Sequence, residues 1–473
     1  MKTHTFKGGI HPKEMKELSN KCPIKAAFPS SRTVTIPVTM GGAPNTPLVK
    51  AGDLVARGQK IADSTAFMSC PVHASIAGKV KKIQTCLVTG GAEVPCITIE
   101  ADDSGREDFM APLDPFTCSE EDALKRIREA GIAGMGGASF PAHVKFNPPK
   151  DKDVEYVLVN AAECEPYLTC DERTLQEESQ KLIDGLAIAL RITGSYGYIA
   201  LEDNKAYIKE ILDKKIIEAG YADDMEVCLV KTKYPQGSEK FIVSAVLGVE
   251  IPTASLPADA GAIVCNVGTL CAISDAFRKG MPQIDRTLTI SGGAVENPCN
   301  LRVPVGTMVS DLIGEYFSVK DDQSVKIISG GPMMGFAMPS ADFPVAKGTS
   351  GITFLTEKET YLKEESQCIS CGKCMEVCAM HLNPVLLVRE LKCNNIEKAK
   401  KLGLMDCIEC GCCAYTCPAG VKIVQRVRMG KDIVRQEMAQ ARARAAMEKV
   451  KAEMALKLAE EAKAKADANG EGK

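Results

Sequence analysis

The chain has 473 residues, of which 45% are hydrophobic and 25% charged, and its formal net charge is −3. This composition indicates an ordinary soluble globular protein with room for three or four domains. No stretch approaches 18 uncharged apolar residues, so we expect no membrane-spanning helix. The 21 cysteines show no disulfide-scaffold spacing, and residues 1–9 contain no apolar signal region, which indicates an intracellular, reduced protein.

Residues 1–115 have the pattern of a small β domain. Short alternating apolar positions are interrupted at Gly52 and Gly58, and a second half of the same kind follows at residues 71–80. This pattern resembles the barrel-sandwich hybrid of lipoyl and biotinyl domains, which carry a prosthetic arm on a lysine between the two halves. Residues 63–70 contain no lysine. We therefore expect a structural or docking domain without a swinging arm.

A glycine-rich loop follows the first predicted helix. A linker at residues 101–117 leads to Ser119, a helix N-cap, and the helix should end at Gly131. The loop differs from a Rossmann fingerprint, because it follows a helix and its glycines are spaced differently. Its glycines let the backbone approach a ligand and direct N–H groups at a phosphate, with Lys145 as countercharge, although a structural turn is the alternative. The loop glycines are Gly131, Gly134, Gly136 and Gly137.

An acidic turn follows the next predicted strand, residues 154–159. Asn160, Glu163, Glu165 and Asp171 come directly after it, at the strand end where α/β sheets bind ligands. Such side chains suit hydrogen bonds to ribose or ribityl hydroxyls and to a nicotinamide amide; a solvated loop is the alternative.

Strand and helix patterns then alternate, which predicts an α/β sheet covered on both faces. The predicted helices are 173–191, 205–219, 238–247 and 267–279, and the predicted strands are 196–201, 225–231 and 262–265. Residues 284–340 change to a small β-grasp pattern, with strands at 286–290, 300–303 and 325–329 and a helix at 309–316.

Two cysteine runs follow, each with the spacing C-x2-C-x2-C-x3-C. In two-cluster ferredoxins the fourth cysteine of such a run binds the other cluster. We therefore assign Cys368, Cys371, Cys374 and Cys417 to one [4Fe–4S] cluster, and Cys407, Cys410, Cys413 and Cys378 to a second. Zinc would leave several of these cysteines unused. Cys412 adjoins Cys413 and competes with it as a ligand, but the spacing favours Cys413.

The last segment, residues 431–466, contains neither proline nor glycine and predicts one helix of about 36 residues. From Val421 onward the chain has 13 Lys and Arg against 8 Asp and Glu. This basic tail suits docking on a membrane or partner surface, although a solvated helix is the common meaning of such a pattern.

Residues 131–331 resemble the flavin- and NADH-binding subunit of respiratory complex I. The resemblance lies in the glycine loop, the acidic turn, residues 234–239, residues 266–270, and a β-grasp like that family's ubiquitin-like domain. It implies that the loop and Lys145 hold FMN and that Phe140 stacks on the dinucleotide. It also implies that Glu163 and Glu165 contact FMN or NADH, with Glu239 and Asn266 as further cofactor-binding residues. Complex I has aspartate at the position of Ala162 and arginine at that of Met135.

Nearly the whole chain up to the tail is similar to the C subunit of the Rnf complex, through residues 8–12, residues 41–44, the turn at 160–167 and the paired cysteine runs. The resemblance implies a peripheral subunit on the cytoplasmic face of the membrane, within a ferredoxin:NAD+ oxidoreductase coupled to Na+ or H+ translocation. Its partners would be a ferredoxin-like subunit and integral-membrane subunits. A soluble reductase similar to the cobalamin reductase of microcompartments and a non-enzymatic iron–sulfur scaffold are the alternatives.

The predicted fold is therefore α/β and multidomain. It comprises a barrel-sandwich-like β domain (1–115), a Rossmann-like α/β FMN/NADH domain (116–282), an SLBB-type β-grasp domain (283–345), a ferredoxin-like helical domain with two [4Fe–4S] clusters (346–430) and a basic helical tail (431–473). Hydride exchange between NAD(H) and FMN, followed by single-electron transfer through the two clusters, is the expected activity. It requires no acid/base catalyst from the named residues.

Overall fold

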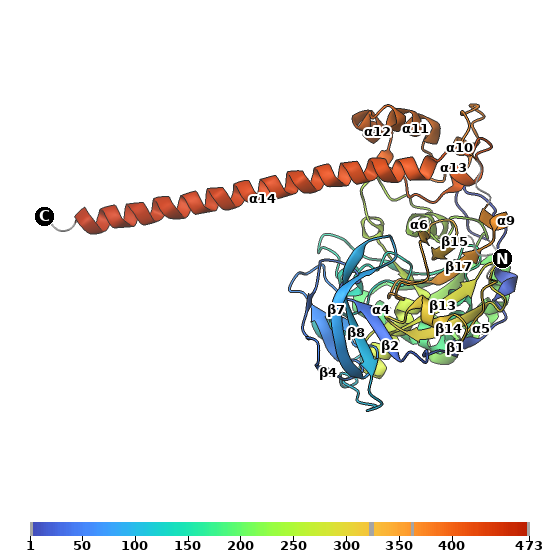
Figure 1. Cartoon of the computed structure of the whole chain (residues 1–473), viewed down its shortest axis with the longest axis horizontal. Coiled ribbons are helices and arrows are strands. Elements are labelled where there is room, and N and C mark those ends of the chain that lie inside the picture. Colours follow the sequence, from blue (N-terminus) through green and yellow to red (C-terminus); the bar gives the residue numbers. More distant parts are fainter. Residues whose placement is uncertain (1–2, 321–325, 361–363, 471–473) are drawn as a thin grey trace. The chain divides into compact units, whose positions relative to one another are not determined.

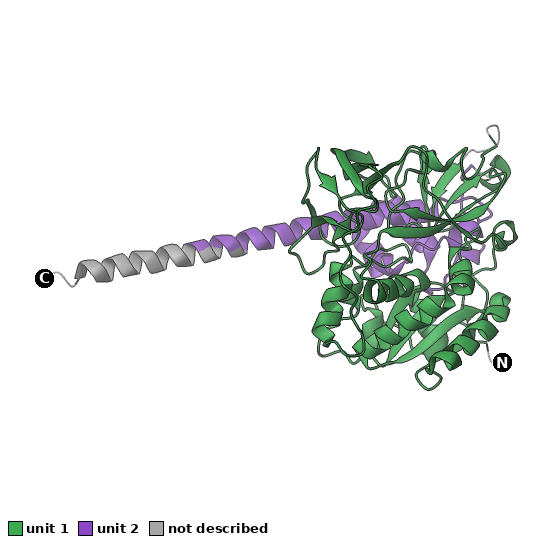
Figure 2. Cartoon of the chain, turned by 90° about the horizontal axis from the view of Figure 1, so that it is seen from below, with its two compact units in different colours: residues 1–363 green, residues 364–473 purple. Residues whose placement is uncertain are grey.

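A computed structural model describes residues 3–320, 326–360 and 364–470. The chain forms two compact units, residues 1–363 and residues 364–473, coloured separately in Figure 2. The glycine loop and the acidic turn belong to the first unit, and both cysteine runs belong to the second.

The centre of the first unit is a four-stranded parallel sheet in the order β11–β10–β9–β12. Alternate residues of its strands face opposite sides. Val157 and Val159 of β9 pack in one core together with α4 and α7, whereas Leu158 packs in a second core with Ile242 of α6. Both faces are therefore covered, as the alternating pattern predicted. The strands are β9 (Tyr156–Ala161), β10 (Tyr196–Glu202), β11 (Met225–Val230) and β12 (Ala262–Asn266).

The helices around this sheet follow the predicted ranges with two exceptions: the four-residue helix α2 was not predicted, and one predicted helix is broken in two. The helix predicted for residues 173–191 is interrupted at Glu178, whose φ of −126° is not helical. The Glu178 carboxylate forms ion pairs with Lys181 at 3.0 Å and Arg302 at 2.8 Å, so a long-range contact accompanies this break. The helices are α1 (Glu120–Glu129), α2 (Ala142–Lys145), α3 (Cys170–Glu177), α4 (Ser179–Thr193), α5 (Ala206–Ala219), α6 (Glu239–Leu247) and α7 (Val267–Arg278).

The β-grasp region forms a six-stranded mixed sheet in the order β1–β14–β13–β17–β15–β16 (Figure 1). Two of its strands come from segments that the sequence grouped elsewhere. β1 belongs to the segment assigned to the first domain, and β17 to the segment assigned to the cysteine domain; both find hydrogen-bonding partners only in the folded chain. The strands are β1 (Ile24–Ala26), β13 (Asp285–Ser291), β14 (Cys299–Pro304), β15 (Lys326–Ser329), β16 (Phe336–Met338) and β17 (Gly351–Leu355).

The helix predicted for residues 309–316 is shorter in the structure. α8 covers only Val309–Leu312, because Ile313 is extended and Gly314 has a φ of +86°. Residue 325, the predicted start of the last β-grasp strand, lies outside the described residues.

A buried hydrogen-bond network joins this sheet to the acidic turn. The Asn300 carboxamide accepts from the hydroxyls of Thr169 (3.1 Å) and Thr289 (2.9 Å), and donates to the carbonyls of Ser19 (3.0 Å) and Cys22 (3.1 Å). Asn300 and Thr289 have no exposed surface. The network therefore fixes the β-grasp against the turn that ends in α3.

The N-terminal region contains two small sheets with a shared core, as expected for a barrel-sandwich hybrid. One has the order β2–β8–β7–β4, and the other β3–β5–β6. Residues 4 and 10 lie outside it and pair with Val230 and Tyr234 of the α/β region. The strands are β2 (Thr33–Pro37), β3 (Thr46–Pro47), β4 (Leu54–Val55), β5 (Lys60–Asp63), β6 (Val72–His73), β7 (Gly78–Leu87) and β8 (Glu93–Ala101).

The second unit is helical. Its core contains Leu387, Leu404, Val427 and Val434, and the four-residue helices α10 (Lys373–Glu376) and α13 (Cys412–Tyr415) lie within the cysteine runs. α14 (Ile423–Gly470) has 48 residues and begins eight residues earlier than predicted (Figure 1). Its first turns pack into the core, which explains the early start. The remaining helices are α11 (Pro384–Lys392) and α12 (Ile396–Lys401).

Candidate functional site

The carboxyl ends of β9 and β12 place two asparagines side by side. Asn160 and Asn266 are paired in the register of these parallel strands. The Asn160 amide donates to the Gly237 carbonyl at 2.7 Å. The Asn266 side chain accepts from the Gly268 N–H at 2.9 Å, capping α7, and donates to Asp171 at 2.7 Å. Residues from three separate segments, the acidic turn, residues 234–239 and residues 266–270, therefore meet at one sheet edge.

The glycine loop lies against this edge. Gly131, with φ of +61°, follows α1, and the loop closes through a hydrogen bond from the Gly134 N–H to the Phe140 carbonyl at 2.8 Å. The Met135 N–H donates to the Thr269 hydroxyl on α7 at 2.9 Å. A Cβ on Gly137 would meet no atom within 4 Å, so this part of the loop is open to a ligand.

Gly136 brings the loop close to the start of α7. A Cβ added there would lie 3.7 Å from the Asn266 Cβ. The loop therefore adjoins the N-terminus of a twelve-residue helix, where the helix dipole and unpaired N–H groups favour an anion. Phe140, the predicted stacking residue, is half-buried at the end of the same loop.

Lys145 and Glu239 form an ion pair at this site. The Lys145 ammonium lies 2.6 Å from a Glu239 carboxylate oxygen and donates to the Val264 carbonyl at 2.7 Å. Burial lowers the pKa of Lys145, but the charges of Glu239 and Cys265 together with the hydrogen bond to Glu239 outweigh burial and leave that pKa raised. The lysine therefore stays protonated at neutral pH and keeps a positive charge next to the sheet edge.

The two glutamates of the acidic turn are engaged by backbone groups. Glu163 accepts from the N–H groups of Asp171 (3.0 Å) and Glu172 (3.3 Å) at the start of α3. Glu165 accepts from the N–H groups of Met333 (3.1 Å) and Met334 (2.8 Å). Both carboxylates thus hold the turn in place, and each retains further acceptor capacity.

Burial perturbs the acids of this turn. It raises the pKa of Glu165 to about 7, although the N–H donors of Met333 and Met334 oppose the shift. Burial and the nearby Glu163 charge raise the pKa of Asp171 to about 6. Perturbed carboxyl groups of this kind gather at functional sites more often than elsewhere.

Two buried cations that sequence reasoning missed support the glycine loop. Lys347 donates to the carbonyls of Gly131 (2.6 Å) and Pro71 (2.9 Å), and Arg286 donates to the Met135 carbonyl at 3.0 Å. Within the described parts of the chain, neither is in an ion pair. No local pattern could have found them, because they contact the loop across 216 and 151 residues of sequence.

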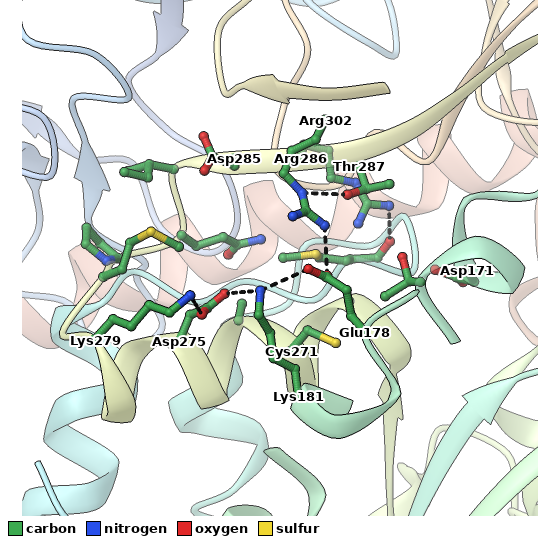
Figure 3. Close-up of a pocket in the computed structure, with 18 residues that line it drawn as sticks. Asp171, Glu178, Lys181, Cys271, Asp275, Lys279, Asp285, Arg286, Thr287 and Arg302 are labelled. Atoms are coloured by element: carbon green, nitrogen blue, oxygen red, sulfur yellow. Dashed lines mark hydrogen bonds and ion pairs between the residues drawn. The ribbon is translucent and has the colours of Figure 1, made fainter. Parts of the chain in front are cut away.

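A cavity of about 260 Å³ lies behind the loop, between α3, α4, α7 and β13 (Figure 3). Met135 and Gly268 are among the residues that line it. Its charged side chains are largely paired with one another: Lys181 bridges Asp275 and Glu178 at 2.9 and 3.0 Å. Because most of these charged side chains already have a partner of opposite charge, we interpret the cavity as part of the polar interior and not as a site for an ionic ligand.

In the second unit the two cysteine runs adopt matching conformations. Gly372 and Gly411 have φ of +78° and +81°. The N–H groups of Ser370 and Glu409 each donate to the sulfur of the first cysteine of their run at 3.4 Å. Backbone N–H groups directed at cysteine sulfurs are among the contacts that tune iron–sulfur clusters.

Electrostatic contacts divide seven of the cysteines into two groups. Burial raises the pKa of Cys378, and the charge of Cys410 raises it further. Burial, with the charges of Cys410, Cys407 and Cys378, raises the pKa of Cys413 to about 12. Burial, with Cys368 and Cys371, raises the pKa of Cys374. Cys378 therefore interacts with Cys410 of the second run, and the crossed assignment of the fourth cysteines stays a prediction.

Cys412 is buried, with 1% of its surface exposed, and its sulfur lies near those of Cys410 and Cys413. The choice of Cys413 as the ligand rests on the spacing and stays a prediction. In the described part of the chain, no helix is both long and apolar enough to cross a membrane.

Taken together, the fold and these sites define a flavin and iron–sulfur class of redox protein. Three family models match: a Nuo51 FMN-binding domain at residues 127–275, an RnfC barrel-sandwich hybrid domain at 4–104, and an SLBB domain at 287–337.

Full-length relatives narrow the class. The chain is 44% identical to the C subunit of the proton-translocating ferredoxin:NAD(+) oxidoreductase complex of Clostridium ljungdahlii, covering 90% of this chain and 93% of the relative. It is 40% identical to the C subunit of the Na(+)-translocating complex of Acetobacterium woodii, covering 93% and 99%. A solved NAD+-reducing [NiFe]-hydrogenase matches at 17% identity with a TM-score of 0.48, over 66% of this chain and 61% of that one. The chain belongs to the family of C subunits of ion-translocating oxidoreductase complexes.

Proposed function

We propose that this chain is the NAD(H)-reactive electron-transfer subunit of a membrane-bound ferredoxin:NAD+ oxidoreductase coupled to Na+ or H+ translocation. The main support is the position of the glycine loop, which adjoins the N-terminus of α7 at the carboxyl edge of a parallel sheet. Two iron–sulfur cysteine runs lie in the same chain. A site for hydride transfer, which moves two electrons, and two sites for one-electron transfer together allow a two-electron donor or acceptor to exchange electrons with one-electron carriers.

The residues at the sheet edge fit FMN and NAD(H). Open backbone at Gly137, next to the exposed Gly136, admits a phosphate or a flat ring, and Lys145 supplies a lasting positive charge. Asn160 and Asn266 offer amide groups at the same edge. When bound, FMN exchanges a hydride with NAD(H) and passes its electrons on singly.

The remaining predicted residues have positioning roles in this proposal. Gly131 and Gly134 shape the loop, and Phe140 stacks on the dinucleotide. Glu163 and Glu165 hold the acidic turn through backbone N–H groups and orient the cofactors with their free lone pairs. Glu239 keeps Lys145 charged.

In the second unit, the two cysteine runs would hold a ferredoxin-like pair of [4Fe–4S] clusters, which would supply one-electron exchange with the flavin. The raised thiol pKa values mean that binding iron displaces protons from these cysteines, as is usual for thiolate metal sites. The proposed partners are a ferredoxin-like subunit and integral-membrane subunits, on the cytoplasmic face.

The tail beyond the core of the second unit is proposed to dock on the membrane or a partner. A truncation that tests this must keep Val434, which packs in that core. Removing residues after Met438 should abolish co-purification with the membrane fraction while both clusters remain. Unchanged membrane association of this truncated chain would refute tail docking.

The function itself is tested by anaerobic purification of the full chain. We expect bound FMN, iron and sulfide for two [4Fe–4S] clusters, and NADH-driven reduction of ferricyanide. A chain without FMN, or one that NADH cannot reduce, would refute the enzymatic assignment. Co-purification with hydrophobic subunits distinguishes the membrane complex from a soluble reductase.

A further inference from the structure

The two cysteine runs share a backbone conformation but differ in the side chains around them. Ser370 and Glu409 occupy equivalent positions, with φ of +55° and +60°, and their N–H groups donate to sulfur at the same distance of 3.4 Å. Backbone hydrogen bonding at this position is therefore alike in the two runs. At this position, a difference in electrostatics between the two runs comes from side-chain charge and from exposure to water.

A buried lysine lies against the second run. Lys431, on the third turn of α14, directs its ammonium at the Cys407 carbonyl and lies 2.9 Å from a Glu409 carboxylate oxygen. Its side chain is 7% exposed. This ammonium therefore contacts the backbone of a proposed cluster ligand, in a place where water screens its charge weakly.

Glu409 does not fully neutralise the charge of Lys431, because the same carboxylate also pairs with two arginines. Arg428 lies 3.0 Å from it and Arg435 lies 3.8 Å away, both also on α14. Arg435 also pairs with Asp432 at 2.8 Å, so three cations and two carboxylates lie next to the second run. In the first run an uncharged serine stands at the position of Glu409, and Lys373, the cation inside that run, is exposed to solvent.

Adding an electron makes a [4Fe–4S] cluster and its thiolates more negative, so a nearby buried cation stabilises the reduced form. Building on the two-cluster function proposed above, we propose that Lys431 selectively raises the reduction potential of the cluster bound by Cys407, Cys410, Cys413 and Cys378. Lys431 is a tuning residue in this proposal, since it acts through the backbone of a cluster ligand. It favours residence of the electron on the second-run cluster.

The test is an EPR-monitored potentiometric titration of the full-length chain, purified anaerobically, in wild type and four variants. Lys431→Met should make one of the two cluster potentials more negative by about 59 mV, which corresponds to about a tenfold change in the one-electron reduction equilibrium. The potential of the other cluster should stay unchanged. Lys431→Arg, which keeps the charge, should leave both unchanged. Glu409→Gln should shift the same cluster in the positive direction, because the cations lose their counter-charge.

Lys400→Met is the matched control, because Lys400 is a partly exposed lysine of the same unit, paired with Glu397 on α12 at 2.6 Å. It should move neither potential. Equal potentials in wild type and Lys431→Met, equal shifts of both clusters, or a shift of the same sign in Lys431→Met and Glu409→Gln would overturn the proposal. If Lys431→Met does not retain the second cluster, the Glu409→Gln variant tests the proposal by itself. A positive shift of one potential would support the proposal, and a negative shift or no shift would overturn it. A wild-type chain lacking two clusters would refute the proposed function instead, because iron and sulfide are measured before the titration.

Discussion

Gly237 is a position where one methyl group should disrupt the cofactor site. A Cβ added there would lie 2.3 Å from the Ala162 carbonyl oxygen and 3.1 Å from the Cys164 sulfur. Ordinary contact distances are about 3.5 Å or more, so the segment around Gly237 must move by about 1 Å away from the acidic turn. The Gly237 carbonyl, which accepts from Asn160 at 2.7 Å, would move with it.

The free-energy cost of Gly237→Ala combines overpacking, about 1–3 kcal/mol, with a weakened hydrogen bond from Asn160, about 0.5–1.5 kcal/mol. If about 1.4 kcal/mol of this cost falls on the FMN-bound state, Gly237→Ala binds FMN tenfold more weakly. Quenching of FMN fluorescence by the FMN-free chain measures this affinity.

Gly220→Ala is the control for Gly237→Ala. Gly220 ends α5 with φ of +80°, and a Cβ there would meet no atom within 4 Å. This variant should lose about 1 kcal/mol of stability through backbone strain while binding FMN normally. If folded Gly237→Ala binds FMN as tightly as wild type, or if both variants lose affinity equally, the assignment of the site to this sheet edge is wrong.

Three further predictions follow from the same contacts. The pKa of Glu165, about 7 when folded against an ordinary 4.5, means that the folded chain binds this proton more tightly, so the free energy of unfolding should fall as pH rises from 4.5 to 7. In urea unfolding, the wild type should lose up to about 3 kcal/mol more unfolding free energy between pH 4.5 and 7 than Glu165→Gln does. The same pH dependence of stability in both proteins would contradict this prediction. Cys413→Ser should lose one cluster's iron and EPR signal while Cys412→Ser keeps both, and the opposite pattern would make Cys412 the ligand. Asn300→Leu leaves buried carbonyls and hydroxyls without partners and should cost about 3–5 kcal/mol in the same urea assay; a loss under 1 kcal/mol would show that the network relaxes.

Local patterns predicted the secondary structure around the α/β sheet well. Ser119 caps α1 by accepting from the Asp122 N–H at 3.1 Å, and the helix closes at Gly131 as expected. Such signals are local, because a cap or a stop depends on residues within one turn. The break at Glu178 was missed, since it coincides with an ion pair to Arg302 on a distant strand.

Local sequence patterns did not predict that β1 and β17 join the six-stranded sheet. β1 and β17 are short segments that acquire a partner only when strands far away in the sequence reach them. Strand pairing is a property of the assembled sheet, so their assignment to neighbouring domains in the sequence differed from the structure. The helix α8 ended early for a related reason, because Ile313 leaves the helix to pair with Phe317.

The sequence by itself determined the chemistry of this protein, because cysteine spacing, loop glycines and strand-end polar residues are local features with a direct chemical meaning. The cysteine spacing led to two [4Fe–4S] clusters, and the resemblance of residues 131–331 to the flavin- and NADH-binding subunit of complex I led to FMN and NAD(H). Only the tertiary structure decided how those residues are supported and charged. Lys347 and Arg286 support the glycine loop from more than 150 residues away, and Lys431 places its charge on Cys407 across 24 residues. A buried charge acts through space, so its effect on a cofactor cannot be seen from its place in the chain.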